Sequence, residues 1–411
     1  MPGMNRFPQG GGAKINGLIK NYLVQVGQTI SAGDFVNFVT GDITTGTSAV
    51  FKSSALGYYK TISAAALSDT KALVVYSADS VLPEAVILTI SGATITVGTP
   101  VILDHASNYF SIAILSSSKA LVSYDNYAAI LTISGTTITK GNSVTAGGSY
   151  NSLVTLSDSK ALLTYSDNNG AAVILSVSST TITVGAIMHY TSGTIAQSIS
   201  ATALSDTKVL VTYVADSKSN AVVLTISGTT ITAGTPVLFW SSYYTYISMV
   251  TLSDTKALII YENGSASGSY GTAVVLTISG TTITIGTAIV FRSAKIGYIS
   301  SAKLSNTSVL ALYEDEGDAG YGKAVILTIS GTTITASTPV LFNNKISLWY
   351  SAAKLLDTKV LVAYQNVNNS NYGTAMILSI PQLAKLAIAS PFDGVAKTSG
   401  TAGAAVDIYT L

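Results

Sequence analysis

The stretch "LSDTKALVVY", residues 67–76, decides the fold because close copies of it recur along the chain. The copies "LSDSKALLTY", "LSDTKVLVTY" and "LSDTKALIIY" begin at Leu156, Leu204 and Leu252. The full set of copies is identified by one position, called the marker residue here: Lys71, Lys119, Lys160, Lys208, Lys256, Ser308 and Lys359. The markers follow one another at intervals of 41 to 52 residues, which indicates an array of seven repeats.

A second motif alternates with the first and shows that the repeats are made of strands. It reads "AVILTISGATIT" from Ala85, and its relatives begin at Ala129, Ala172, Ala221, Ala273 and Ala324. Val, Ile, Thr and Tyr dominate both motifs in short alternating runs, a pattern typical of β-strands. Each repeat therefore divides into four strands, which in the fifth repeat read "TYISMVTL", "ALIIYE", "AVVLTIS" and "TTITIGTAIVF".

Two tight turns separate these strands. The first and second strands are joined by "SDTK", in which Asp254 and its equivalents can bond the backbone of the turn. The third and fourth are joined by "SGTT", in which Gly280 can adopt a positive φ. Four antiparallel strands repeated seven times predict an all-β fold, a seven-bladed β-propeller of four-stranded blades. An open β-solenoid is the alternative.

The ends of the array favour the closed propeller. The seventh repeat, "TAMILSIPQLAKL", lacks the turn and the fourth strand that the other repeats have. A matching strand lies near the start of the chain, because "ITTGTSAVF" at 43–51 resembles "ITAGTPVLF" at 231–239. We expect this N-terminal strand to pair with residues 375–380 and close the ring, since an open ring would leave two bare strand edges.

The strand order assigns the loops to two faces and the chain to three parts. One face, the turn face, carries the uniform "SDTK" and "SGTT" turns, whereas the opposite, varied face carries loops of differing sequence. We predict a flexible arm at 1–13 and a propeller at 42–380. The short alternating runs in 14–41 and 381–411 predict one small β domain made from both termini, located beneath the turn face.

Composition excludes several classes of function. The net charge is +1 and only 10% of residues are charged, which argues against nucleic acid as a partner. The two arginines, Arg6 and Arg292, are too few for an enzyme that surrounds an anionic sugar. There is no cysteine, and no apolar run reaches the ~18 residues of a membrane helix, so we expect no thiolate metal site and no membrane insertion.

Titratable residues give no clear catalytic constellation, so we predict no catalytic residue, metal or cofactor. His105 and His189 are far apart in the sequence and are expected to be structural. Acidic residues gather in the loops of the varied face, where they are either ordinary polar loop residues or part of a weak cation site or sugar-binding rim. They are Asp79, Asp125, Asp167, Asp216, Glu262, Glu314, Asp315, Glu316 and Asp318.

Aromatic residues are the best candidates for ligand binding. One tyrosine per repeat follows the second strand, from Tyr76 to Tyr364, and its regularity indicates core packing. Less regular aromatics precede the first strands, in loops of the varied face, and exposed tyrosine beside Ser, Gly and Asn suits an adaptable binding surface. The predicted ligand-binding residues are Tyr58, Tyr109, Tyr244, Tyr246, Tyr298, Trp349 and Tyr350.

The terminal segments resemble known proteins. The phrases "RFPQGGG" at 6–12, "VGQTISAGDFVNF" at 26–38 and "GVAKTSGTAGAAVDIYTL" at 394–411 resemble the termini of virion surface proteins of tailed bacteriophages. The resemblance implies a non-enzymatic structural protein of the virion, whose terminal domain fastens to a capsid or tail protein and displays the propeller as a surface decoration. The alternative is a module that binds host-surface glycan or another receptor for attachment.

Overall fold

The computed structural model describes residues 43–57, 62–77, 82–242, 246–265 and 268–381, together with six two-residue strands near the chain ends. The chain divides into two compact units. One unit comprises residues 43–380, and the other combines residues 1–42 with 381–411.

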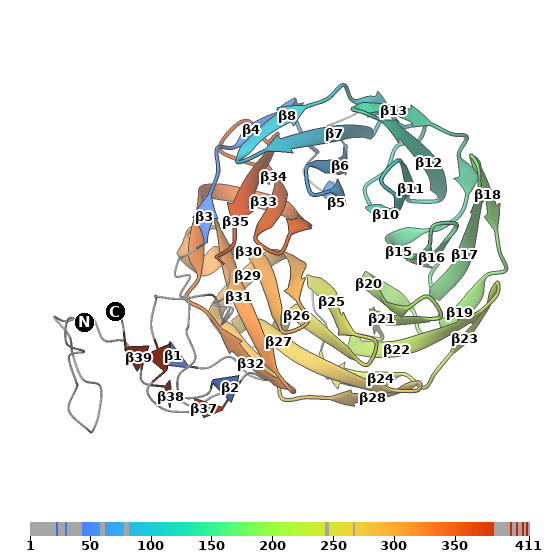
Figure 1. Cartoon of the computed structure of the whole chain (residues 1–411). Helices are drawn as coiled ribbons and strands as arrows, with labels where there is room; N and C mark the ends of the chain where they lie inside the picture. The colour runs from blue at the N-terminus through green and yellow to red at the C-terminus, as the bar shows by residue number, and fades with distance from the viewer. Residues whose placement is uncertain are drawn as a thin grey trace. The chain divides into compact units, whose positions relative to one another are not determined.

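The larger unit consists of antiparallel sheets (Figure 1): repeats one to four each form a five-stranded sheet, and the strands of repeats five to seven, with β3 and β4, form one thirteen-stranded sheet. Repeats one and two contain β5 (Ile62–Ser68), β6 (Lys71–Tyr76), β7 (Glu84–Ser91), β8 (Thr94–Val97), β9 (Val101–Ile102), β10 (Phe110–Ser116), β11 (Lys119–Tyr124), β12 (Tyr127–Ser134), β13 (Thr137–Lys140) and β14 (Val144–Thr145). Repeats three and four contain β15 (Ser149–Ser157), β16 (Lys160–Ser166), β17 (Gly170–Ser178), β18 (Thr181–Val184), β19 (Met188–Thr191), β20 (Ile195–Ser205), β21 (Lys208–Ala215), β22 (Lys218–Ser227), β23 (Thr230–Ala233) and β24 (Val237–Trp240).

The last three repeats are joined by two long strands, each of which belongs to two successive repeats. They contain β25 (Ile247–Ser253), β26 (Lys256–Ser265), β27 (Gly268–Ser279), β28 (Thr282–Ile285), β29 (Ile289–Ser305), β30 (Ser308–Asp315), the 3-10 turn η1 (Glu316–Asp318), β31 (Tyr321–Ser330), β32 (Thr333–Ala336), β33 (Val340–Leu356), β34 (Lys359–Asn366) and β35 (Tyr372–Ser379). The start of β29 pairs with β27 of the fifth repeat and its end pairs with β30 of the sixth, and β33 links the sixth and seventh repeats in the same way.

The sheets surround a central space, with the first strand of each repeat innermost (Figure 1). The fold is therefore all-β, as predicted, and β-propeller-like. Every marker residue is the first residue of a second strand, for example Lys71 of β6 and Ser308 of β30. The predicted fourth strand is broken into two short strands in each repeat. In the first repeat the break begins at Gly98, whose N–H bonds the carbonyl of Ile87 at 2.8 Å.

The turn between the third and fourth strands needs a residue with positive φ. Gly280 has a φ of 63°, and a Cβ added there would meet no atom within 4 Å, so the turn favours glycine for its backbone conformation alone. In the other turn the serine, and not the predicted aspartate, bonds the backbone. The Oγ of Ser253 accepts a bond from the N–H of Thr255 at 3.3 Å, two residues beyond it.

The marker lysines connect neighbouring repeats on the turn face. The Nζ of Lys71 donates to the carbonyl of Gly135, in the next repeat's glycine turn, at 3.1 Å. Lys256 makes the same contact with Gly331 at 3.2 Å. Both kinds of turn therefore lie on one face, and the recurring lysine is a link between sheets.

A serine lies eight positions before each marker, and Ser111, Ser152, Ser300 and Ser351 of this set form a second, inner set of links. The full set of serines is Ser63, Ser111, Ser152, Ser200, Ser248, Ser300 and Ser351. The Oγ of Ser111 accepts a bond from the N–H of Leu153 in the following repeat at 2.8 Å, and Ser300 accepts one from Ala352 at 3.0 Å. Short serine side chains thus join the innermost strands directly, where little space separates them.

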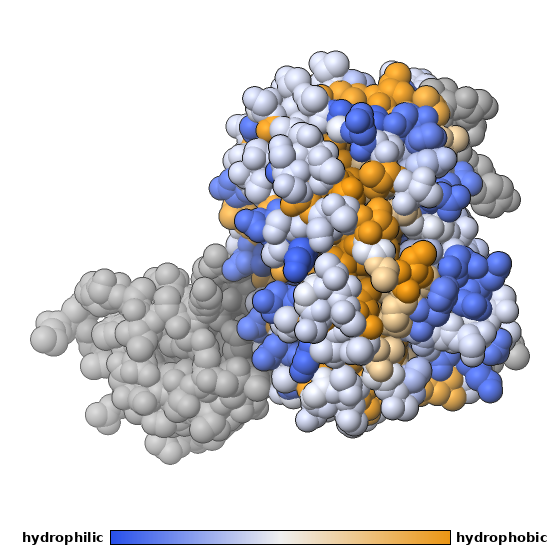
Figure 2. Space-filling model, turned by 90° about the vertical axis from the view of Figure 1, so that its right-hand side faces the viewer, coloured by the Kyte–Doolittle hydropathy of each residue, from blue (hydrophilic) through white to orange (hydrophobic). Residues whose placement is uncertain are grey.

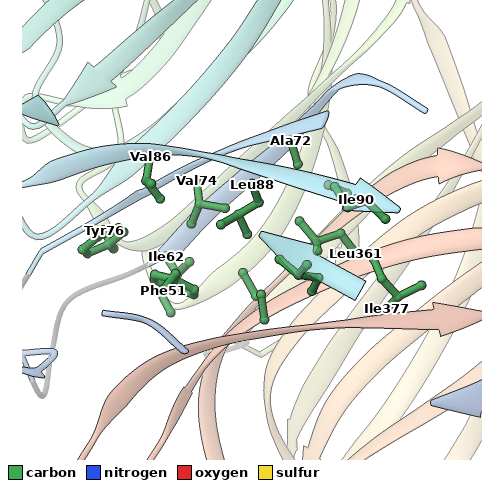
Figure 3. Packing of buried hydrophobic residues seen from close by; sticks show 14 of the residues in the cluster. Phe51, Ile62, Ala72, Val74, Tyr76, Val86, Leu88, Ile90, Leu361 and Ile377 are labelled. Carbon is green, nitrogen blue, oxygen red and sulfur yellow. The ribbon is translucent and has the colours of Figure 1, made fainter. Parts of the chain in front are cut away.

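The first and last repeats contact each other through strands from opposite ends of the unit. β3 (Thr44–Thr45) and β4 (Ala49–Ala55) both pair with β35, with Ala49 opposite Ala375. The inner serine of the seventh repeat, Ser351, accepts a bond from the N–H of Ala64 at 2.8 Å. Between the two repeats, one buried cluster brings together side chains from both (Figure 3): Phe51, Ile62, Tyr76, Leu361 and Ile377.

The recurring tyrosines belong to the core, as predicted. Tyr76 and Tyr313 are fully buried, and Tyr165, with 3% of its surface exposed, is the most accessible of the set. The outer surface, in contrast, retains apolar side chains, and Figure 2 shows an apolar band with polar margins on the side viewed. Several exposed large apolar residues lie on outer strands or strand segments: Val50 of β4, Ile102 of β9, Leu238 of β24, Val290 of β29 and Leu341 of β33.

The described residues of the smaller unit form three strand pairs, two of which join the chain ends. β1 (Tyr22–Leu23) pairs with β38 (Ala405–Val406), and β2 (Thr29–Ile30) pairs with β37 (Gly400–Thr401). β36 (Val395–Ala396) pairs with β39 (Ile408–Tyr409). Segments from both termini therefore contribute to one unit. The predicted arm at 1–13 lies outside the described residues.

The cluster between the first and last repeats predicts a large effect of one substitution. Phe51→Ala removes a buried ring whose centroid lies 4.9 Å from that of Tyr76, and should lower the free energy of unfolding by about 3–5 kcal/mol. Val50→Ala, at the neighbouring exposed position, should change it by less than about 0.5 kcal/mol. Chemical denaturation followed by circular dichroism measures both. Equal losses for the two variants would contradict the packing of β4.

Candidate functional site

One cavity of about 620 Å³ receives side chains from all seven repeats. Its lining comes from the residues ten and nine positions before the marker in repeats two to seven, and from the residue nine positions before it in repeat one: Ile62, Tyr109, Phe110, Tyr150, Asn151, Ser198, Ile199, Tyr246, Ile247, Tyr298, Ile299, Trp349 and Tyr350. These strands run from the cavity to the serine turns, so the cavity opens on the varied face. Its volume lies within the range of small-molecule sites.

In repeats three, four, six and seven, irregular backbone directs the first of the two lining residues into the cavity. Tyr150, Tyr298 and Trp349 have φ values of 56°, 48° and 56°, and Ser198 at the equivalent position has 35°. The register between the first and second strands shifts at each of these positions, as in a β-bulge. A bulge re-aims a side chain that a regular strand would direct elsewhere. Left-handed φ is unfavourable for aromatic residues, so the surrounding sheet must hold this conformation.

The aromatic residues form two separate groups. Tyr298 contacts both of its neighbours, with ring centroids 4.7 Å from those of Tyr246 and Trp349; these three residues are called the three-ring wall. Tyr109 and Tyr150, with centroids 4.8 Å apart, form the two-ring wall. The three-ring wall comes from repeats five to seven and the two-ring wall from repeats two and three. Repeat four lies between them.

Five of the seven predicted ligand-binding residues line this one cavity. They are Tyr109, Tyr246, Tyr298, Trp349 and Tyr350. Tyr58 and Tyr244 lie outside the described residues. Although the prediction placed Tyr350 in a loop, it is only 6% exposed and packs against Phe342, with ring centroids 5.6 Å apart.

Eight lining residues were not among the predicted set, and three of them bear on the chemistry of the wall. Tyr150 completes the two-ring wall, Ser198 occupies the position of the aromatic residues in repeat four, and Asn151 contributes an amide. Their distance from the marker residue identifies all three in the sequence: Tyr150 and Ser198 lie ten positions before it, and Asn151 lies nine positions before it. Asn151 is held in place, because its Nδ2 donates to the carbonyl of Asp125 at 2.6 Å.

The cavity wall is uncharged among the residues that the structure describes. Burial raises the pKa of Tyr246, and the hydrogen bond with Tyr298 raises it further. Burial likewise raises the pKa of Tyr109, as does its neighbour Tyr150. These phenols therefore stay protonated at neutral pH. They can donate hydrogen bonds to a neutral ligand.

A buried carboxyl group lies directly behind the three-ring wall. Glu314 pairs with Gly297 across the strands, and a Cβ at Gly297 would lie 3.0 Å from the Oε2 of Glu314 and 3.6 Å from the Tyr246 ring. Gly297 thus leaves room for both groups. Burial, with a smaller contribution from the nearby Glu316, raises the pKa of Glu314 to about 7, while Lys295 opposes the rise.

The other acidic residues of repeat six are paired with basic side chains. Asp315 is fully buried and lies 3.0 Å from both the Nη2 of Arg292 and the Nζ of Lys323. Lys323 also contacts Asp318, and the Nζ of Lys295 lies 2.7 Å from Glu316. Basic side chains of the protein itself therefore balance the charges of these acidic residues. Within the described residues, no cluster of three or more His, Asp or Glu side chains could hold a metal ion.

The two histidines lie apart from the cavity lining. The ring of His105 stacks on Tyr127, with centroids 3.6 Å apart. The Nε2 of His189 lies 3.0 Å from the Oδ2 of Asp167. As for membrane association, the portion of the chain that the structure describes has no helix with the length and apolar character needed to span a bilayer.

Comparisons with known proteins support the fold and do not extend to function. No protein-family model and no curated protein matches the chain. A protein from Lactobacillus plantarum superposes with a TM-score of 0.54 at 12% identity, covering 80% of this chain and 96% of its own. A functionally unknown protein from Desulfotomaculum acetoxidans gives 0.50 at 12% identity, covering 71% and 95%. Likeness at this identity shows only a shared β-propeller-like fold.

The raised pKa of Glu314 predicts a pH dependence of stability. Between its ordinary value of 4.5 and about 7, the folded chain holds a proton that the unfolded chain releases, so stability falls as pH rises through this range. Glu314→Gln removes this loss and should make the protein about 1–2 kcal/mol more stable than the parent at pH 8. Denaturant unfolding at several pH values measures the difference.

A second variant serves as control for this prediction. Glu316→Gln removes a like charge that helps raise the folded-state pKa of Glu314, so the fall in stability should be smaller and should end at a lower pH than in the parent. Parallel stability curves for the parent protein and Glu314→Gln across pH 4–8 would contradict the assignment.

Proposed function

We propose that this protein is a non-enzymatic binding and display module that takes a neutral saccharide at the aromatic cavity. The observation that carries the proposal is the composition of the cavity wall, in which seven of the thirteen lining residues are aromatic and none is charged among those described. Apolar walls with a few placed polar groups are typical of small-molecule sites.

The chemistry of the wall suits a sugar. Aromatic faces pack against the C–H groups of a sugar ring, and the tyrosine hydroxyls and Asn151 supply hydrogen bonds for its hydroxyl groups. A carboxylate or phosphate on the ligand would meet no basic partner in the described wall, and burying an unpaired charge is costly. Binding without catalysis is favoured because the phenols of Tyr109 and Tyr246 are held protonated and are poor nucleophiles.

We also propose a complete architecture for the larger unit. The larger unit is a seven-bladed propeller closed by β3 and β4, which supply the fourth strand of the seventh blade. Pairing of β4 with β35 and the bond between Ser351 and Ala64 support closure. A closed ring fixes the seven lining positions relative to one another, which a preorganised site requires.

The smaller unit supplies attachment. Its strands come from both termini, and its sequence carries the resemblance to surface proteins of tailed phages. We therefore propose that the protein decorates a virion, bound to a capsid or tail protein through this unit, and that the cavity serves attachment to host-surface glycan. Cryo-electron microscopy of purified particles would test the location, and absence of the protein from the particle would overturn it.

The binding proposal predicts specific losses on a glycan array probed with the full-length chain. Trp349→Ala should weaken binding of any recognised neutral glycan roughly tenfold or more, because it removes one ring of the three-ring wall. Tyr321→Ala, in β31 and outside the cavity, should leave binding unchanged. No binding to neutral glycans by the parent protein would refute the proposal.

Closure of the ring is tested by a disulfide, because the native chain has no cysteine. Ala49→Cys with Ala375→Cys places two thiols at directly opposed strand positions, where they should cross-link on oxidation. Ala49→Cys with Ala324→Cys should not, since Ala324 of repeat six pairs with Val340 and not with Ala49. Mass spectrometry of proteolytic fragments detects the link. A missing link in the first pair would reject closure.

A further inference from the structure

The separation of the two aromatic walls points to the length of the ligand, an inference that rests on the proposed function. The three-ring wall is continuous through Tyr298, whereas the two-ring wall stands apart on repeats two and three. A single sugar ring packed on one wall would leave the other wall unused. Two separate stacking surfaces in one cavity suit a ligand that has at least two stackable units.

Ser198 interrupts the aromatic rim between the two walls. It occupies the same position of its repeat as Tyr150 before it and Tyr246 after it, ten residues before the marker. A serine in place of an aromatic ring leaves the rim lower at this point. A chain bound across the cavity therefore has an exit beside repeat four.

We propose that the ligand is an extended neutral oligosaccharide that lies across the cavity, with one sugar on each wall and its chain leaving past Ser198. The three-ring wall is the primary subsite, since its three adjacent rings provide the larger stacking surface. The two-ring wall is the second subsite. Once the first sugar is bound, contact of a linked sugar with the second wall is intramolecular, so affinity increases with chain length.

The backbone permits a direct test at the rim. Trp349 has a φ of 56° at the position equivalent to Ser198, so an aromatic residue is compatible with this local conformation. Ser198→Trp would therefore raise the rim at repeat four without demanding a new backbone geometry. Ser117→Trp makes the same substitution at an exposed residue of a turn between first and second strands, on the turn face, and is the matched control.

The experiment measures chain-length dependence on an array that displays linear neutral glycans from monosaccharide to hexasaccharide, including β-1,4-linked N-acetylglucosamine and α-1,4-linked glucose. For the full-length parent, affinity for the recognised glycan should rise at least about tenfold once the chain is long enough to reach both walls, and then level off. Ser198→Trp should bring the ratio of long-chain to short-chain affinity close to one, whereas Ser117→Trp should keep the parent's ratio.

A second variant keeps the test decisive if Ser198→Trp fails to fold. Tyr109→Ala shortens the two-ring wall and should also reduce the length dependence, whereas Trp349→Ala should weaken short and long chains alike. Equal affinity of the parent for monosaccharide and hexasaccharide would overturn the two-wall inference while leaving saccharide binding intact. Failure of every neutral glycan to bind would instead overturn the proposed function.

Discussion

Hydrogen bonds between neighbouring innermost strands are the contacts on which the arrangement of the larger unit depends. First strands of adjacent repeats do not pair as a sheet, so their alignment has to come from side chains. The Oγ of Ser152 receives the N–H of Ala201 at 3.0 Å, and the same geometry recurs at Ser351 and Ala64. Because the Oγ of serine is only two bonds from Cα, these contacts hold the strands that line the cavity close together.

Much of the fold could be predicted from the repeat pattern, because strand and turn propensities act locally. The marker residues begin second strands, and Gly280 has the positive φ expected of it. Two local details were missed, because they depend on exact backbone geometry and not on residue type alone: the fourth strand breaks in two, and Ser253 takes the turn bond that was assigned to Asp254. The all-β, propeller-like architecture is confirmed, whereas the seventh blade and ring closure remain proposals.

The type of residue that lines the site could be predicted from the sequence, but the orientation of the side chains could not. Aromatic residues before the first strands were recognised, and five of them line one cavity. Their orientation was not predictable, because it results from bulges that shift the register beside Tyr298 and Trp349. Burial of Tyr350 follows from packing against Phe342 of an outer strand segment, a contact between residues of one long strand that periodicity does not reveal.

The placement of one lining residue per repeat on a common backbone position has an evolutionary consequence. Tyrosine, serine and tryptophan all occupy this position within a single chain, on similar left-handed conformations. The core tyrosines and the linking serines lie at other positions and do not change when the lining residue does. Six sites, in repeats two to seven, can therefore diversify independently of the scaffold, so a lineage could acquire new recognition by point substitutions alone.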